Sequence, residues 1–227
     1  PRTKILGKYR LNFHGIGAPQ RTLEPGEAPY WVTSDFFHEA LALAHGLRNR
    51  VETRFTFDDG NLSDLQIGAE GLARHGMTGS FFVLSNRLGQ PGSLGADDLI
   101  ELQRQGHEIG LHGAGHRDWT SLDAAGLSEE LDTARDILQK ASNRPVFAAA
   151  IPFGRYNRTV LRALTSRGYK RVYSSDGGPS RATDMPIPRT SPRADMGLAD
   201  IEAVLLGREG LKRRLRRRLA QEIKKRV

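Results

Sequence analysis

The feature that most constrains the fold of this 227-residue chain is a repeating order of short apolar runs and longer amphipathic stretches. The short runs favour strands, and the amphipathic stretches have helical periodicity and often end at glycine. We predict strands at residues 10–13, 51–57, 80–84, 107–111, 146–151 and 171–174, and helices at residues 35–45, 63–75, 96–105, 128–141 and 157–167. Such alternation implies parallel strands joined by right-handed crossovers, so about seven strands form either a barrel or an open sheet in one α/β domain.

The net charge of +8 is concentrated in one segment, residues 208–227. This segment holds ten Lys or Arg and two Glu, whereas residues 1–207 balance at 24 bases and 24 acids. We therefore divide the chain into a domain at residues 1–207 and a basic amphipathic helix at residues 208–227. The helix is predicted because apolar residues recur at every fourth position: Leu211, Leu215, Leu219, Ile223 and Val227.

Two roles are favoured for this basic helix, and a third is disfavoured. In the first role the helix packs on the domain with its basic face in solvent. In the second it adsorbs to an anionic membrane, where each basic residue near the surface contributes about 1 kcal/mol to the free energy of adsorption. Nucleic acid is disfavoured as a partner, because residues 1–207 show no second basic patch. No apolar run approaches the ~18 residues of a membrane span, and no signal peptide is recognised, which favours a cytoplasmic or membrane-peripheral location.

Two motifs place carboxylates and imidazoles directly after predicted strands. Asp58-Asp59-Gly60 follows the strand at 51–57, and the pair His112 and His116 follows the strand at 107–111. Because parallel strands bring their carboxyl ends to one edge, these side chains are expected to meet. One carboxylate and two imidazoles form a three-ligand metal set, and the other carboxylate can face a bound water. Taken singly, Asp-Asp-Gly is also typical of a turn, and paired histidines of packed or solvated side chains.

Four segments together resemble the successive motifs of the polysaccharide deacetylases, the carbohydrate esterases of family four. They are Thr56-Phe57-Asp58-Asp59-Gly60, Gly79-Ser80-Phe81-Phe82-Val83, Gly106-His107-Glu108-Ile109-Gly110-Leu111-His112 with His116, and Pro152-Phe153-Gly154. The resemblance covers residues 10–189 and implies a distorted, incomplete (β/α) barrel. It also implies metal-dependent removal of N-acetyl, sometimes O-acetyl, groups from a glycan. It assigns Asp58 as general base, the backbone N–H of Phe153 as oxyanion donor, and as metal ligands Asp59, His112 and His116.

The chain departs from the family motifs at two places. Where the family has an arginine that orients the base, this chain has Ala150, and Asp176 lies near the place of that arginine's usual partner. The late histidine that protonates the leaving amine is also absent, since no histidine follows Asp176. His14, after the first predicted strand, is either a substitute acid or a structural histidine. Arg189 falls near the late motif and is predicted to hold substrate or an oxyanion, because a guanidinium stays protonated.

Two aromatic residues, Trp119 and Tyr156, are either platforms for a sugar ring or packed side chains. We take them, with Arg189 and Asp176, as predicted substrate contacts. The chain has no cysteine, so a cation must be held by His, Asp or Glu, a donor set that suits Zn²⁺ but also Co²⁺, Ni²⁺ or Fe²⁺. The predicted function is a metal-dependent glycan deacetylase. The alternative is a catalytically impaired glycan-binding homologue that keeps the metal site.

Overall fold

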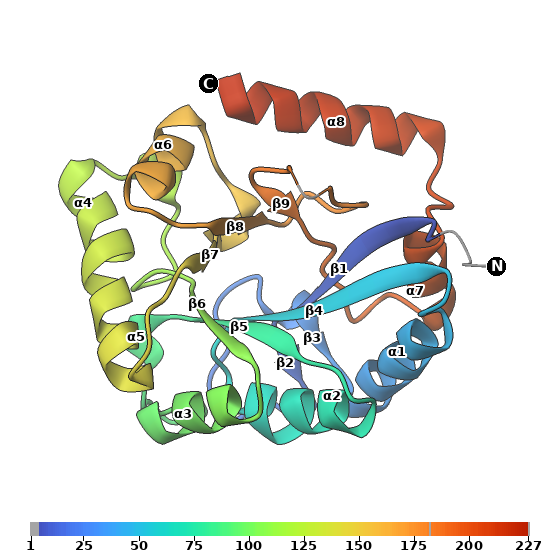
Figure 1. The fold of residues 1–227 in the computed structure, drawn as a ribbon, viewed down its shortest axis with the longest axis horizontal. Helices are drawn as coiled ribbons and strands as arrows, with labels where there is room; N and C mark the ends of the chain where they lie inside the picture. The colour runs from blue at the N-terminus through green and yellow to red at the C-terminus, as the bar shows by residue number, and fades with distance from the viewer. Residues whose placement is uncertain (1–4, 182, 227) are drawn as a thin grey trace.

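A computed structural model describes residues 5–181 and 183–226, and a seven-stranded parallel sheet forms its centre (Figure 1). The strands pair in the order β1, β4, β5, β6, β7, β8 and β9. Their bounds are Gly7–Phe13 (β1), Val51–Asp59 (β4), Gly79–Val83 (β5), Glu108–Leu111 (β6), Ala148–Ala150 (β7), Arg171–Ser174 (β8) and Ile187–Pro188 (β9). The predicted parallel α/β arrangement is confirmed. Strand β9 has too few residues to give a periodic signal and was not predicted.

The two edges of the sheet meet just after β9. Thr190 pairs in parallel with Leu11 of β1, donating its N–H to the carbonyl of Arg10 at 2.8 Å and accepting from the N–H of Asn12 at 2.9 Å. Among the described residues, the strand pairing that joins these edges is much shorter than the seven-residue register between β1 and β4, so the barrel is closed by much weaker pairing. The predicted distorted (β/α) barrel is therefore confirmed.

Helices lie around the outside of the sheet (Figure 1). Their bounds are Ser34–Gly46 (α1), Glu70–Arg74 (α2), Ala96–Arg104 (α3), Ala124–Ser128 (α4), Ala134–Ser142 (α5), Arg158–Ser166 (α6), Leu198–Leu205 (α7) and Leu211–Arg226 (α8). Two of the predicted helices contain π-helical segments, at Asp64–Ala69 and Glu129–Thr133. A small second sheet pairs β2 (Gly15–Ile16) with β3 (Trp31–Val32).

Alternation along β4 decides which side chains enter the barrel. Phe57 points outward, where it stacks on Phe81 at 4.5 Å between ring centres and packs against Phe37 of α1. Its neighbours Thr56 and Asp58 point the other way, because successive side chains of a strand face opposite sides. Both are buried and share hydrogen-bond partners inside the barrel. The register of β4 therefore places the Asp58 carboxylate in the barrel interior.

Helix α8 confirms that the basic tail is helical over Leu211–Arg226; Val227 lies outside the described residues. Its orientation fits the packing alternative only in part, because Lys212 and Arg216 of the basic face stay exposed while Lys224 turns inward. Lys224 contacts the barrel, whereas the apolar stripe is exposed at Leu215 (65%), Leu219 (64%) and Ile223 (52%). The barrel rim under α8 offers two acceptors to Lys224, the Asp176 carboxylate and the Gly154 carbonyl, and these polar contacts hold this part of the helix to the barrel. None of the described helices has the length and apolar character needed to cross a membrane.

Candidate metal centre and active site

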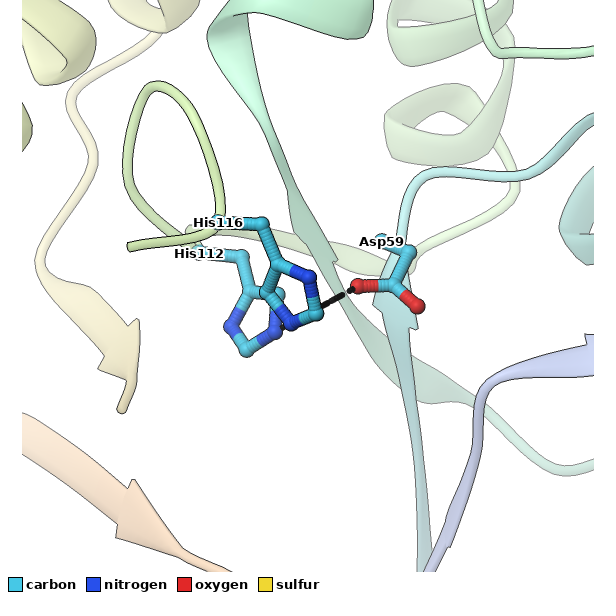
Figure 2. Close-up of side chains that lie close together, drawn as sticks. All are labelled: Asp59, His112 and His116. Carbon is cyan, nitrogen blue, oxygen red and sulfur yellow. Dashed lines mark ion pairs between the residues drawn. The ribbon is translucent and has the colours of Figure 1, made fainter. Parts of the chain in front are cut away.

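The three predicted ligands come together at the carboxyl ends of β4 and β6. Candidate ligand atoms of Asp59, His112 and His116 all lie within 4.8 Å of one another, and Figure 2 shows the side chains converging. The Asp59 Oδ1 atom is 3.5 Å from His112 Nε2 and 3.7 Å from His116 Nε2. This oxygen is buried and has no hydrogen-bond partner among the described residues. A buried carboxylate oxygen that faces two imidazole nitrogens fits a cation, because an unpaired charge is costly to bury.

Hydrogen bonds fix the orientation of both imidazoles. His112 Nδ1 donates to the carbonyl of Ala150 at 2.9 Å, and His116 Nδ1 donates to the carboxylate of Glu24 at 3.0 Å. Arg87 pairs with the other oxygen of Glu24. With Nδ1 carrying the proton, the Nε2 lone pair of each ring faces Asp59. Such outer partners orient metal-binding imidazoles and raise their basicity.

His112 is held neutral, as a metal ligand must be. Burial lowers the pKa of the His112 imidazole to about 4, although the charges of Asp58 and Asp59 oppose this shift. A neutral imidazole offers its lone pair without first losing a proton. Together with the bare Asp59 oxygen, this makes the three residues a fitting site for a divalent cation.

Three site residues have left-handed backbone conformations that residues other than glycine rarely adopt. The φ angles are 78° at Asp59, 54° at His116 and 58° at Phe153. Such conformations cost about 1–3 kcal/mol each and persist where the surrounding structure imposes them, often at functional sites. Here they turn the chain so that side chains at the ends of β4, β6 and β7 point into one pocket.

The predicted base, Asp58, forms a bidentate pair with Arg189. The guanidinium donates to Oδ1 at 2.7 Å and to Oδ2 at 2.8 Å, and both side chains are buried. Asn12 connects the two residues, donating to Asp58 Oδ2 at 3.0 Å and accepting from Arg189 at 2.8 Å. Burial alone would raise the pKa of the Asp58 carboxyl, but the Arg189 charge and the neighbouring imidazoles outweigh it and lower the pKa below its usual range. Asp58 is therefore ionised and fixed in orientation.

The prediction that Arg189 contacts substrate is wrong, because its guanidinium is fully buried beneath Asp58. Arg189 instead orients Asp58, the role predicted to be vacant because residue 150 is alanine. The guanidinium lies 5.3 Å from the ring centre of Phe82 and 5.7 Å from that of Tyr173, in the cluster that contains Ala150. The small side chain at 150 leaves room there, so an arginine from the end of β9 reaches the base.

The remaining predicted residues divide between the pocket and the core. A pocket of about 590 Å³ over the metal centre is lined by His14, Asp58, Asp59, His112, His116, Phe153 and Asp176, among others. Substrate contact by Trp119 is contradicted, because the ring is fully buried and its N–H donates to Glu130. Substrate contact by Tyr156 in this pocket is also contradicted, because the buried hydroxyl donates to Asp176 at 2.8 Å. Both side chains belong to the packing alternative.

His14 lies beside the base at the pocket wall. Its Nε2 is 4.0 Å from Asp58 Oδ2 and 3.5 Å from the amide nitrogen of Asn12, and its ring packs against Tyr30. Phe153 projects into the same pocket, with its ring centre 4.4 Å from that of His116. Asp176 also lines this pocket, and its carboxylate accepts from Lys224 of α8 at 2.7 Å.

Glu24 and Asn12 belong to the site, but they were not predicted. Glu24 lies in an irregular loop and is 92 residues from His116, so no local pattern connects them. Asn12 had a weak signal, as a polar residue between the apolar Leu11 and Phe13 of a predicted strand. The signal for the Asp58–Arg189 contact was stronger. A buried carboxylate that lacks the family's usual arginine needs another cation as its partner, and Arg189 is in the right part of the sequence.

Comparison with known proteins supports this geometry. The sequence pattern of the family described as polysaccharide deacetylase matches residues 49–172, more than half of the 227 residues. The chain belongs to the polysaccharide deacetylase family. The predicted resemblance is thereby confirmed.

Individual deacetylases are similar to only part of the sequence. YxkH of Bacillus subtilis is 25% identical over 158 residues, which are 70% of this chain and 53% of that protein. A chitin deacetylase of Arthroderma benhamiae is 29% identical over 119 residues, 52% of this chain and 32% of that protein. The chain therefore spans about half the length of the first relative and a third of the second. The Streptococcus pyogenes deacetylase PplD, solved with acetate, shares the fold at a TM-score of 0.72 and 20% identity, over 89% of this chain and 99% of that one.

Proposed function

We propose that this chain is a metal-dependent hydrolase that removes N-acetyl, or alternatively O-acetyl, groups from a glycan. The observation that carries the proposal is the buried Asp58–Arg189 pair beside the Asp59, His112 and His116 ligand set. A carboxylate held ionised at the edge of a three-ligand site is arranged to accept a proton from water. Membership of the deacetylase family and the acetate bound by similar PplD support the same chemistry.

Asp59, His112 and His116 would hold the cation, and zinc suits these nitrogen and oxygen donors best, with Co²⁺, Ni²⁺ and Fe²⁺ as alternatives. A bound divalent cation lowers the pKa of water and polarises a carbonyl. Asp58 accepts the proton that the attacking water loses, while Arg189 keeps its carboxylate in place. The backbone N–H of Phe153 stabilises the negative charge that develops on the acetyl oxygen. Of the four predicted substrate contacts, Asp176 remains, and it lines this pocket.

His14 is proposed as the acid that protonates the leaving amine, because it is the histidine at the pocket wall that no ligand role occupies. General acid catalysis typically contributes about 10²–10⁴-fold. The His14→Ala variant should therefore lower turnover about a hundredfold and leave the metal content unchanged. Activity assays paired with elemental analysis measure both quantities, and wild-type turnover in the variant would rule out this role.

Acetate release from N-acetylglucosamine oligomers tests the proposed reaction. Release should stop after chelation, return on addition of Zn²⁺, and be lost in Asp58→Asn while the variant still binds metal. The competing proposal is a glycan-binding homologue without turnover. It would be favoured if several glycans gave no acetate yet bound in a metal-dependent way. The Asp58–Arg189 pair argues against it, because an impaired homologue has no need of an oriented base.

We also propose that α8 docks on an anionic membrane surface. Its exposed stripe of Leu215, Leu219 and Ile223 lies beside the exposed cations Lys212 and Arg216, as in helices that bind the lipid interface. Sedimentation with phosphatidylglycerol vesicles should retain the wild-type chain. The Leu215→Gln/Leu219→Gln variant should remain in the supernatant. Equal sedimentation of the two would contradict docking through this stripe.

A further inference from the structure

A second cavity, of about 300 Å³, lies between α8 and the segment that connects β8 to β9. One wall is the inner side of α8, with Arg214, Arg217 and Arg218, and Arg181 lies on the segment that forms the other wall. Figure 1 shows α8 as a rod alongside this part of the barrel. The cavity shares Gly177 with the metal pocket, but none of the metal ligands lines it. It is therefore a separate space, next to the proposed catalytic site.

The described side chains that line this cavity carry an excess of positive charge. Five are cationic and one, Asp184, is acidic; the cationic residues are Arg181, Arg214, Arg217, Arg218 and Lys225. Beyond the lining, Glu209 pairs with Arg217, and Glu222 lies 3.9 Å from Lys225. With both of these acids counted, two positive charges remain. Cations held around one space repel each other, and an anion between them would relieve that repulsion.

The cavity wall is shaped by residues that hold the cations close to the backbone. Gly178 has a φ of 82°, and a Cβ at this position would lie 2.4 Å from the Arg217 guanidinium. Only glycine lets Arg217 lie flat against the loop. Pro179, Pro186 and Pro188 form part of the lining, and their fixed φ angles stiffen it. The cationic groups therefore line a preformed space that is open to solvent.

We infer that this cavity binds a phosphoryl group. The guanidinium fork matches the oxygens of phosphate with two parallel hydrogen bonds, and a dianionic phosphoryl group balances the excess of two charges. The group belongs either to a soluble phosphate monoester, which carries both charges, or to a phospholipid headgroup, whose phosphodiester carries one of them. In both cases phosphoryl oxygens face Arg181, Arg214 and Arg218. The inference does not depend on deacetylase activity, because the site shares no ligand with the metal centre.

Calorimetric titration of the full chain with inorganic phosphate, at constant ionic strength, tests the site. The Arg214→Gln/Arg218→Gln variant should weaken binding about tenfold or more, since each charged hydrogen bond is worth more than that factor. Lys212→Gln/Arg216→Gln removes the same charge from exposed positions of the same helix that do not line the cavity, and should bind within about twofold of wild type. Arg181→Gln, on the opposite wall, should also weaken binding, which separates the cavity from any damage to α8.

Two results would overturn the inference: no saturable phosphate binding by the wild-type chain, or an equal loss of binding in the cavity variant and the matched surface variant.

The source of the phosphoryl group is resolved with vesicles. If a phospholipid supplies it, the cavity variant also loses binding to phosphatidylglycerol vesicles. If a soluble ester supplies it, vesicle binding follows the exposed stripe and the cavity variant keeps it.

Discussion

Arginine has opposite surroundings in two neighbouring regions of this barrel. In the interior, Arg189 is fully buried, yet its guanidinium is matched by one carboxylate, one amide oxygen and a backbone carbonyl. Under α8, Arg181, Arg214 and Arg218 line an open cavity in which cations outnumber acids. The first region is complete without any other molecule. The second has an excess charge that only solvent or a ligand can balance.

This difference shows how to tell a structural charge from a binding charge. A buried cation must be paired by the protein itself, because desolvation of an unpaired charge costs several kcal/mol. A cation at the wall of a cavity is hydrated and needs no protein partner. Excess charge is therefore tolerated only where water or a ligand reaches it. Lys224 lies between the two regions, since it extends from α8 but pairs with Asp176 of the pocket at the candidate metal centre.

The largest expected effect is on stability, from Arg189→Met. The substitution leaves Asp58 buried and unpaired, so the free energy of unfolding of the metal-free protein should fall by about 3–5 kcal/mol. Arg104→Met is the matched control, because Arg104 pairs with Glu101 on the exposed surface, where solvent screens the pair, and the substitution should change stability far less. Urea denaturation measures both. Equal losses would show that the interior pair does not differ from a surface pair.

A smaller effect, on activity, is expected at the boundary between the regions. Lys224 donates to the carbonyl of Gly154 at 3.0 Å and to Asp176 at 2.7 Å, so it holds the turn that presents the Phe153 N–H. Because small displacements of catalytic groups are costly, Lys224→Met should lower kcat/KM for acetate release about tenfold. Arg226→Met removes the same charge from an exposed position two residues further on, which lines neither pocket, and should stay within about twofold of wild type. Similar losses in both variants would assign the effect to overall charge.

Asp64 tests whether a buried acid, like a buried cation, must be paired by the protein if it is to stay charged. It is buried, neither carboxylate oxygen has a hydrogen-bond partner among the described residues, and burial, with the charges of Asp59 and Asp58, raises its pKa well above the usual value. The unfolded chain ionises this carboxyl above about pH 4, whereas the folded chain keeps the proton, so Asp64 makes stability fall as the pH rises. Asp64→Asn should therefore stabilise the metal-free protein by about 1 kcal/mol or more at pH 8, and by little at pH 4. Thermal unfolding at the two pH values measures this, and a gain independent of pH would contradict it.

The smallest effect is expected under α8. Arg214→Gln removes one of several repelling cations, so in phosphate-free buffer the free energy of unfolding should change by less than about 0.5 kcal/mol. A loss of several kcal/mol in a denaturant titration would mean that Arg214 is paired as tightly as Arg189, and the contrast between the regions would then fail.

Local sequence determined much of this protein. The alternation of apolar runs and amphipathic stretches predicted the parallel α/β order, because burial on both faces imposes its pattern on each strand separately. The position of Asp58, Asp59, His112 and His116 at predicted strand ends was enough to bring these side chains together as a candidate metal site, since parallel strands end at one edge.

Tertiary structure alone decided which charges pair. Arg189 reaches Asp58 across 131 residues, and Glu24 reaches His116 across 92, so neither contact leaves a trace in the local pattern. The same holds for α8, where periodicity fixed the apolar stripe but not the direction it faces. That direction depends on the acceptors of the barrel rim, because a helix turns toward whichever surface satisfies its side chains. Periodicity describes one element by itself, whereas charge pairing depends on how the elements are packed together.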